Sequence, residues 1–107
     1  ISNIFSADLL AEKGFLDVEV TKGSGDYGVD ILAEKDGVTY AVQEVLHAPI
    51  GVKAVQEVYA GRDYYDRMVG AVMKTSILLT AAVAAAGKLK ILLWDRGYID
   101  SMMEEQD

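Results

Sequence analysis

Two short polar segments contain the residues of this sequence that are best suited to metal-dependent chemistry. The first is Asp26-Tyr27-Gly28-Val29-Asp30, and the second, Gln43-Glu44, lies near the end of the next apolar stretch. Carboxylate and amide oxygens are ligands that Mg²⁺ accepts, and bound Mg²⁺ supports the hydrolysis of phosphodiester bonds. Asp30, Gln43 and Glu44 are therefore the first candidates for a metal-binding site.

A predicted β-hairpin would bring these two segments together. Residues 29–33 and 38–46 are typical of strands, and Asp36-Gly37 between them is a strong signal for a two-residue turn. Antiparallel pairing of the two strands would place Asp30 roughly opposite Gln43. Residues 43 and 45 are two positions apart in the second strand, so their side chains would share a face of the sheet.

The other predicted elements extend this hairpin into a covered sheet. Gly14 and Gly87 are placed to end the first and third helices. Helical crossovers around the last two strands require parallel pairing, so the order α-β-β-β-α-β-α-β predicts one α/β domain with a central, mixed, five-stranded sheet flanked by helices. The predicted helices cover residues 1–13, 52–66 and 80–86, the strands cover 17–21, 29–33, 38–46, 69–74 and 90–94, and a last helical turn covers 99–103.

Composition limits the class of protein. The 107 residues are 51% hydrophobic and 25% charged, which is ordinary for one globular domain over residues 1–107. There is no apolar run of about 18 residues that would predict a membrane span. The absence of cysteine excludes disulfides and thiolate metal sites and fits a reducing compartment. With no signal for secretion, we expect a cytoplasmic location.

The net charge bears on how tightly the chain could bind DNA. Ten Lys and Arg residues against 17 Asp and Glu residues give a net charge of −7. Proteins that hold DNA obtain most of their affinity by neutralising phosphates, so this balance argues against tight DNA binding by the chain alone. It remains compatible with a nuclease domain whose grip on DNA comes from a separate domain.

The two polar segments resemble the nuclease motif of Mrr-type restriction endonucleases, in which Gly-Asp-x-Gly-x-Asp is followed by Gln-x-Lys. The resemblance implies a restriction-endonuclease-like fold, Mg²⁺-dependent hydrolysis of DNA, and Asp30 and Gln43 as catalytic residues on the metal side. Glu44 would be an extra metal ligand. The chain could also form a homodimer. The matching segments are residues 21–30, Gln43-Glu44-Val45, Pro49-Ile50-Gly51, residues 55–61 and Leu93-Trp94-Asp95-Arg96.

The chain departs from the family pattern at the positions that the resemblance predicts to take part in catalysis. Val45 stands where the resemblance requires lysine, and Leu46-His47 replaces a stretch that is basic and aromatic in the family. Asn3 is the nearest position to the glutamate of the family's first helix. Loss of one preorganised electrostatic contact costs about 3–4 kcal/mol of barrier. We therefore expect a nuclease domain that is inactive or weakly active, altered by divergence or by engineering.

Lys74 is a further candidate catalytic residue, with three interpretations. It follows the apolar strand 69–73 and is either a lysine at the rim of the sheet without a role or a migrated nuclease lysine that replaces the one missing at position 45. It could also be an amine nucleophile in a rebuilt pocket, acting on a carbonyl compound. A non-catalytic domain that oligomerises or binds partners is the remaining alternative, which exposed apolar residues such as Leu78 and Met102 would support.

Structural roles compete with these functional ones. Asp26 is more often a turn residue than a ligand, and Gln43 could be a satisfied interior amide. Glu57 and Arg62 are expected on the solvated face of a helix, and Trp94 is expected in the core.

Overall fold

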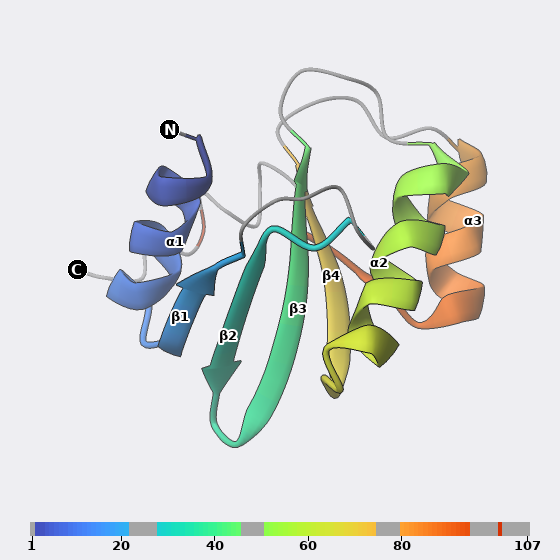
Figure 1. Cartoon of the computed structure of the whole chain (residues 1–107). Helices are drawn as coiled ribbons and strands as arrows, with labels where there is room; N and C mark the ends of the chain where they lie inside the picture. The colour runs from blue at the N-terminus through green and yellow to red at the C-terminus, as the bar shows by residue number, and fades with distance from the viewer. Residues whose placement is uncertain (1, 22–27, 46–50, 75–79, 95–100, 102–107) are drawn as a thin grey trace.

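The chain folds around one five-stranded sheet with the strand order β1-β2-β3-β4-β5 (Figure 1). The structure is a computed structural model that describes residues 2–21, 28–45, 51–74, 80–94 and 101. The observed element order confirms the predicted one. The elements are α1 (Ser2–Glu12), β1 (Leu16–Val20), β2 (Ile31–Lys35), β3 (Val38–Val45), α2 (Val52–Tyr64), β4 (Val69–Lys74), α3 (Thr80–Leu89) and β5 (Leu92–Trp94).

The hairpin of β2 and β3 lies at the centre of this sheet. β1, β2 and β3 pair antiparallel, whereas β3, β4 and β5 pair parallel. α1 lies on one side of the sheet, and α2 and α3 lie together on the other (Figure 1). This arrangement confirms the predicted mixed sheet with helices on both faces.

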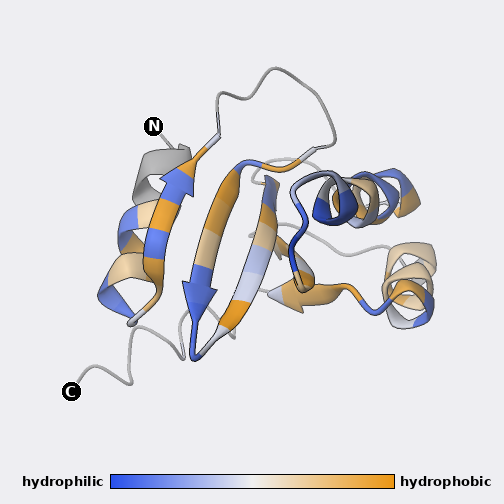
Figure 2. Ribbon diagram, turned by 60° about the horizontal axis from the view of Figure 1, so that its bottom comes forward, coloured by the Kyte–Doolittle hydropathy of each residue, from blue (hydrophilic) through white to orange (hydrophobic). Residues whose placement is uncertain are grey.

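Alternating strand residues build one apolar cluster on each face. The α1-side cluster includes Leu10, Ile31, Val42 and Trp94, which confirms the core position of Trp94. β2 is hydrophobic at its start and hydrophilic at its end, towards the hairpin turn (Figure 2). Within the described segments, no helix is long and apolar enough to span a membrane. The α2/α3-side cluster consists of Val29, Leu32, Ala41, Val55, Val58, Val72, Ala82, Ala86 and Ile91.

The end of α1 follows from the glycine after it. Gly14 has φ +93°, the left-handed conformation that glycine adopts at little cost. The Phe15 N–H donates to the Leu10 carbonyl at 3.0 Å, and the Gly14 N–H donates to the Ala11 carbonyl at 3.2 Å. These two bonds form a Schellman motif, so Gly14 ends the helix as predicted.

Gly87, in contrast, does not end α3, and that prediction was wrong. The helix continues to Leu89, and Lys90 takes the left-handed conformation with φ +58°. The Ile91 N–H donates to the Ala86 carbonyl at 3.0 Å, while both side chains are buried in the α2/α3-side cluster. An apolar contact between these two positions commonly accompanies this helix end, so packing rather than the glycine decides where α3 stops.

The turn of the central hairpin has the predicted chemistry. Asp36 and Gly37 have φ values of +54° and +81°, as a type I′ turn requires. The resulting register pairs Ile31 with Val42. β2 begins at Ile31 rather than at residue 29, so Asp30 precedes the strand instead of lying early within it.

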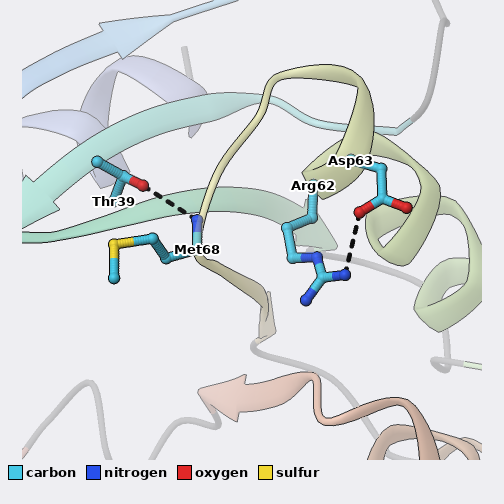
Figure 3. A network of polar contacts seen from close by, with 4 residues as sticks. All are labelled: Thr39, Arg62, Asp63 and Met68. Carbon is cyan, nitrogen blue, oxygen red and sulfur yellow. Dashed lines mark hydrogen bonds and ion pairs between the residues drawn. The ribbon is translucent and has the colours of Figure 1, made fainter.

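A backbone contact fixes how β4 enters the sheet. The Met68 N–H donates to Thr39 Oγ1 at 3.0 Å and to the Thr39 carbonyl at 3.1 Å (Figure 3). The parallel register that follows runs from Tyr40 beside Val69 to Val45 beside Lys74. Lys74 of β4 therefore lies beside Val45 of β3, the position at which the family resemblance predicts a lysine.

Candidate functional site

Asp30 is held in place by its backbone and by its carboxylate. Its N–H donates to the Val42 carbonyl at 2.8 Å, and its carbonyl accepts from the Thr21 N–H at 2.9 Å. Its Oδ2 accepts from the Glu44 N–H at 2.7 Å. The carboxylate is therefore fixed near the last residues of β3.

Glu44 reaches from β3 towards α1. The Ser6 hydroxyl donates to Glu44 Oε2, which connects the first helix to the strand. Glu44 Oε1 is buried and has no hydrogen-bond partner. An unpaired buried oxygen of this kind costs free energy unless water, a proton or a cation satisfies it.

Electrostatics couple the two carboxylates. Burial raises the pKa of Asp30, and the hydrogen bond from the Glu44 backbone opposes this rise. Burial also raises the pKa of Glu44, and the nearby negative charge of Asp30 raises it further, whereas the Ser6 hydrogen bond lowers it. The ionised pair is thus disfavoured in isolation, and a bound cation would relieve both the desolvation and the repulsion.

The pair suits Mg²⁺ better than a metal that needs a full protein cage. Mg²⁺ usually keeps several waters and binds through one or two carboxylates. Among the described residues, no group of three or more His, Cys, Asp or Glu side chains forms a metal cluster. The two carboxylates and the unpaired Glu44 Oε1 fit a hydrated cation, with Ser6 positioning Glu44.

Gln43 points to the opposite side of β3. Its Nε2 donates to Oε1 of Glu57 on α2 at 3.4 Å, and its own Oε1 is buried without a partner. Glu57 is half-buried, so the expectation that it lies on the solvated helix face was wrong. The structure thus brings Asp30 and Glu44 together and turns Gln43 towards α2.

Arg62, also expected on the solvated face, is only partly exposed. Its side chain is 25% exposed, its Nε is buried, and its Nη2 lies 3.0 Å from Asp63 Oδ1 (Figure 3). The guanidinium also stands over the Tyr59 ring, 5.2 Å from the centroid. Arg62 is therefore part of the surface structure of α2.

Lys74 is the direct neighbour of Val45 across β3 and β4. Paired residues of parallel strands point to the same face of a sheet. Val45 packs against the α2/α3-side cluster, so the half-buried Lys74 emerges on that face too. Asp26, His47, Leu78 and Met102 lie outside the described residues.

Ser6 and Glu57 are the site residues that sequence reasoning missed. Ser6 lies three and four positions before Leu9 and Leu10, on the buried stripe of α1, and a serine on that stripe was the available signal. Glu57 lies next to Val58 at the edge of the buried stripe of α2. Asn3, considered for the first helix, lies where the structure describes no side chains.

Comparisons with known proteins agree with this architecture. The family model Mrr_cat, described as restriction endonuclease, matches residues 3–103. The crystal structure of AF1548, a protein of unknown function, superimposes with a TM-score of 0.79 at 21% identity, covering 98% of this chain and 65% of that one. No curated protein matches significantly. Since the family model covers nearly the whole sequence, the chain belongs to the Mrr-type restriction endonuclease family.

Proposed function

We propose that this chain is a nuclease domain that hydrolyses phosphodiester bonds of DNA, and that Asp30 and Glu44 hold the Mg²⁺ that restriction endonucleases usually use. The observation that carries the proposal is the hydrogen bond from the Glu44 N–H to the Asp30 carboxylate, which keeps two half-buried carboxyl groups with raised pKa values near each other, beside an unpaired Glu44 Oε1. Gln43, which the sequence also predicted on the metal side, points to the α2 face of β3 and lies away from Glu44. Mg²⁺ bound by Asp30 and Glu44 would supply Lewis-acid activation of the phosphate or of a water.

The protein would hold the Asp30 and Glu44 carboxylates in position before the metal binds. Asp30 is anchored by the Glu44 backbone through Oδ2, which leaves Oδ1 for a ligand. The Ser6 hydroxyl holds Glu44 through Oε2 in the same way and leaves Oε1. Two carboxylates that each keep one anchored and one available oxygen require little rearrangement when a cation arrives.

Metal binding is tested by titrating Mg²⁺ while following thermal unfolding and heat of binding. We expect Mg²⁺ to raise the melting temperature of the chain, because a ligand that binds only the folded state stabilises it. Asp30→Asn and Glu44→Gln should each remove most of this rise. Asp63→Asn, which removes one negative charge from α2 elsewhere, is the matched control. Equal stabilisation of all four proteins would refute the assignment.

Cleavage should be weak or absent, because Val45 cannot supply the positive charge of a lysine. The cost of one such contact is about 10²–10³ in rate. We expect little nicking of supercoiled plasmid in Mg²⁺, and recovery of activity in Val45→Lys that Asp30→Asn abolishes again. Robust nicking by the unchanged chain that persists in Asp30→Asn would count against the proposal.

Any residual cleavage is assigned to Lys74 as the migrated cation. Its place beside Val45 in the parallel register supports this role. Lys74→Met should abolish residual nicking, and the double variant Val45→Lys with Lys74→Met should restore it. If Lys74→Met cleaves as well as the unchanged chain, Lys74 is a rim lysine without a role.

A further inference from the structure

Thr21, the residue after β1, is bonded to the backbone on both sides of the Asp30 side chain. The Thr21 hydroxyl donates to the Val29 carbonyl at 2.7 Å and also lies 3.3 Å from the Asp30 carbonyl. The Thr21 N–H donates to the same Asp30 carbonyl at 2.9 Å. Thr21 therefore contacts two successive carbonyls immediately beside the proposed metal-binding carboxylate.

These contacts continue the pairing of β1 with β2 beyond its last regular pair. The register ends with Val20 beside Ile31, so Thr21 and Asp30 occupy the next position along the two strands. Both residues are half-buried. Because strand ends open more readily than strand centres, a side-chain bond at this position adds order where the backbone pairing stops.

The peptide group between Val29 and Asp30 is held at both of its ends. Its carbonyl accepts from the Thr21 hydroxyl, and its N–H donates to the Val42 carbonyl at 2.8 Å. Because a peptide group is planar, bonds at its two opposite ends fix its rotation. The peptide group after Asp30 is held by the Thr21 N–H. With both flanking planes fixed, the direction in which the Asp30 side chain leaves the backbone is fixed as well.

The carboxylate of Asp30 depends on this direction. Its Oδ2 accepts from the Glu44 N–H at 2.7 Å, so a rotation of the Asp30 backbone would lengthen this bond and displace both carboxylate oxygens. A binding site must hold its groups within about 0.5 Å of the geometry that binds. A residue that fixes the backbone of Asp30 therefore affects how well its carboxylate meets a ligand.

We propose that Thr21 is a positioning residue, whose hydroxyl fixes the peptide group before Asp30 and thereby aims the Asp30 carboxylate at the cation. This inference rests on the proposed function, because the cation is the Mg²⁺ that Asp30 and Glu44 would hold. Partners that orient metal ligands typically change metal affinity by about 10–100-fold when they are removed. Thr21 acts through the backbone, so we expect an effect of about tenfold, the low end of this range.

Two pairs of side chains that differ in the hydroxyl test this role in Mg²⁺ titrations followed by calorimetry. Thr21→Val keeps the branched shape and the backbone bond, and should weaken Mg²⁺ binding by about tenfold. Thr21→Ser should keep the affinity of the unchanged chain, whereas Thr21→Ala should bind as weakly as Thr21→Val. Thr39→Val is the matched control, because it removes a hydroxyl that accepts from the Met68 N–H near the opposite end of β3. It should leave the affinity unchanged.

A second measurement needs no metal. The Glu44 backbone N–H reports the position of the Asp30 carboxylate, because it donates to Asp30 Oδ2. In ¹H–¹⁵N spectra of the metal-free protein, its proton signal should move upfield in Thr21→Val as this bond lengthens. The signal should keep its place in Thr21→Ser and in Thr39→Val. A role of Thr21 in stability alone would lower the melting temperature of Thr21→Val without moving the signal.

The inference and the proposed function fail in different ways. If the Glu44 signal is the same in Thr21→Val as in the unchanged chain, or if Thr21→Ser binds Mg²⁺ as weakly as Thr21→Ala, the inference is overturned. If the signal moves but Thr21→Val keeps its Mg²⁺ affinity while Asp30→Asn abolishes binding, the inference fails and the proposed function stands. If Mg²⁺ binds none of the proteins, or binds Asp30→Asn as tightly as the unchanged chain, the proposed function fails and the inference fails with it.

Discussion

Adjacent residues at the end of β3 serve opposite sides of the sheet. Glu44 contacts Ser6 of α1, whereas Gln43 contacts Glu57 of α2. Each of these two side chains leaves one buried oxygen without a protein partner. The end of β3 therefore holds two buried oxygens whose desolvation destabilises the folded chain, and a ligand that binds them would offset this cost.

The pH dependence of stability tests this at the residue scale. Burial raises the pKa of Glu44 in the folded state, so the folded chain favours the protonated side chain. The contribution of this proton to the free energy of unfolding is fully present below the unfolded pKa and is lost as pH rises through the folded pKa. Without metal, Glu44→Gln should therefore be more stable than the unchanged chain at pH 7, and the difference should vanish below about pH 4. Chemical denaturation across this range measures it, and a difference that grows on acidification would contradict the prediction.

Local turn chemistry explains why most elements could be predicted from the sequence. The Asp36-Gly37 turn and the Gly14 stop both depend on residues that adopt positive φ, and both were confirmed. The end of α3 could not be predicted, because it depends on burial of Ile91 against neighbouring elements. The same limit applies to the site: Asp30 and Gln43 were visible as a motif, whereas the contact of Glu57 with Gln43 arises only because α2 packs on β3.

Two glycines give a test at the element scale. Gly87 is exposed inside α3, and a Cβ there would meet nothing within 4 Å, so Gly87→Ala should stabilise the protein by about 1 kcal/mol. Gly28→Ala should destabilise it, because of its positive φ and the 2.8 Å approach to Glu57 Cβ. Urea unfolding of both variants measures the two effects. A loss of stability in Gly87→Ala would show that this glycine has a conformational role.

Net charge governs how the whole molecule meets a polyanion. At −7, the chain should bind duplex DNA no more tightly than a non-specific contact, with a dissociation constant weaker than about 1 µM at physiological salt. Fluorescence anisotropy against ionic strength measures this affinity and its salt dependence. Tight binding at physiological salt would mean that a local basic surface outweighs the net charge.

The chain spans 65% of the length of AF1548, the similar structure of unknown function. The net charge of −7 predicts that weak DNA binding limits cleavage by this chain at low DNA concentration. Fusing the Val45→Lys variant to a basic, non-specific DNA-binding module should therefore raise nicking more at low DNA concentration than at saturation. An equal rise at both concentrations would place the limitation in the chemical step.

Among the strands that the structure describes, β1 lies at one end of the sheet, which has a consequence for self-association. Leu16 and Val20 are 61% and 40% exposed there, a combination that invites strand addition by a second copy. Between Leu16 and Glu19, however, β1 carries one more residue than its partner, and Asp17 has φ +51°. This bulge interrupts the row of outward amides, so the edge is a poor template for amyloid-like growth. Deleting Asp17 should straighten the edge and promote aggregation at high protein concentration, visible by light scattering; an unchanged monomer would show that the bulge has no protective effect.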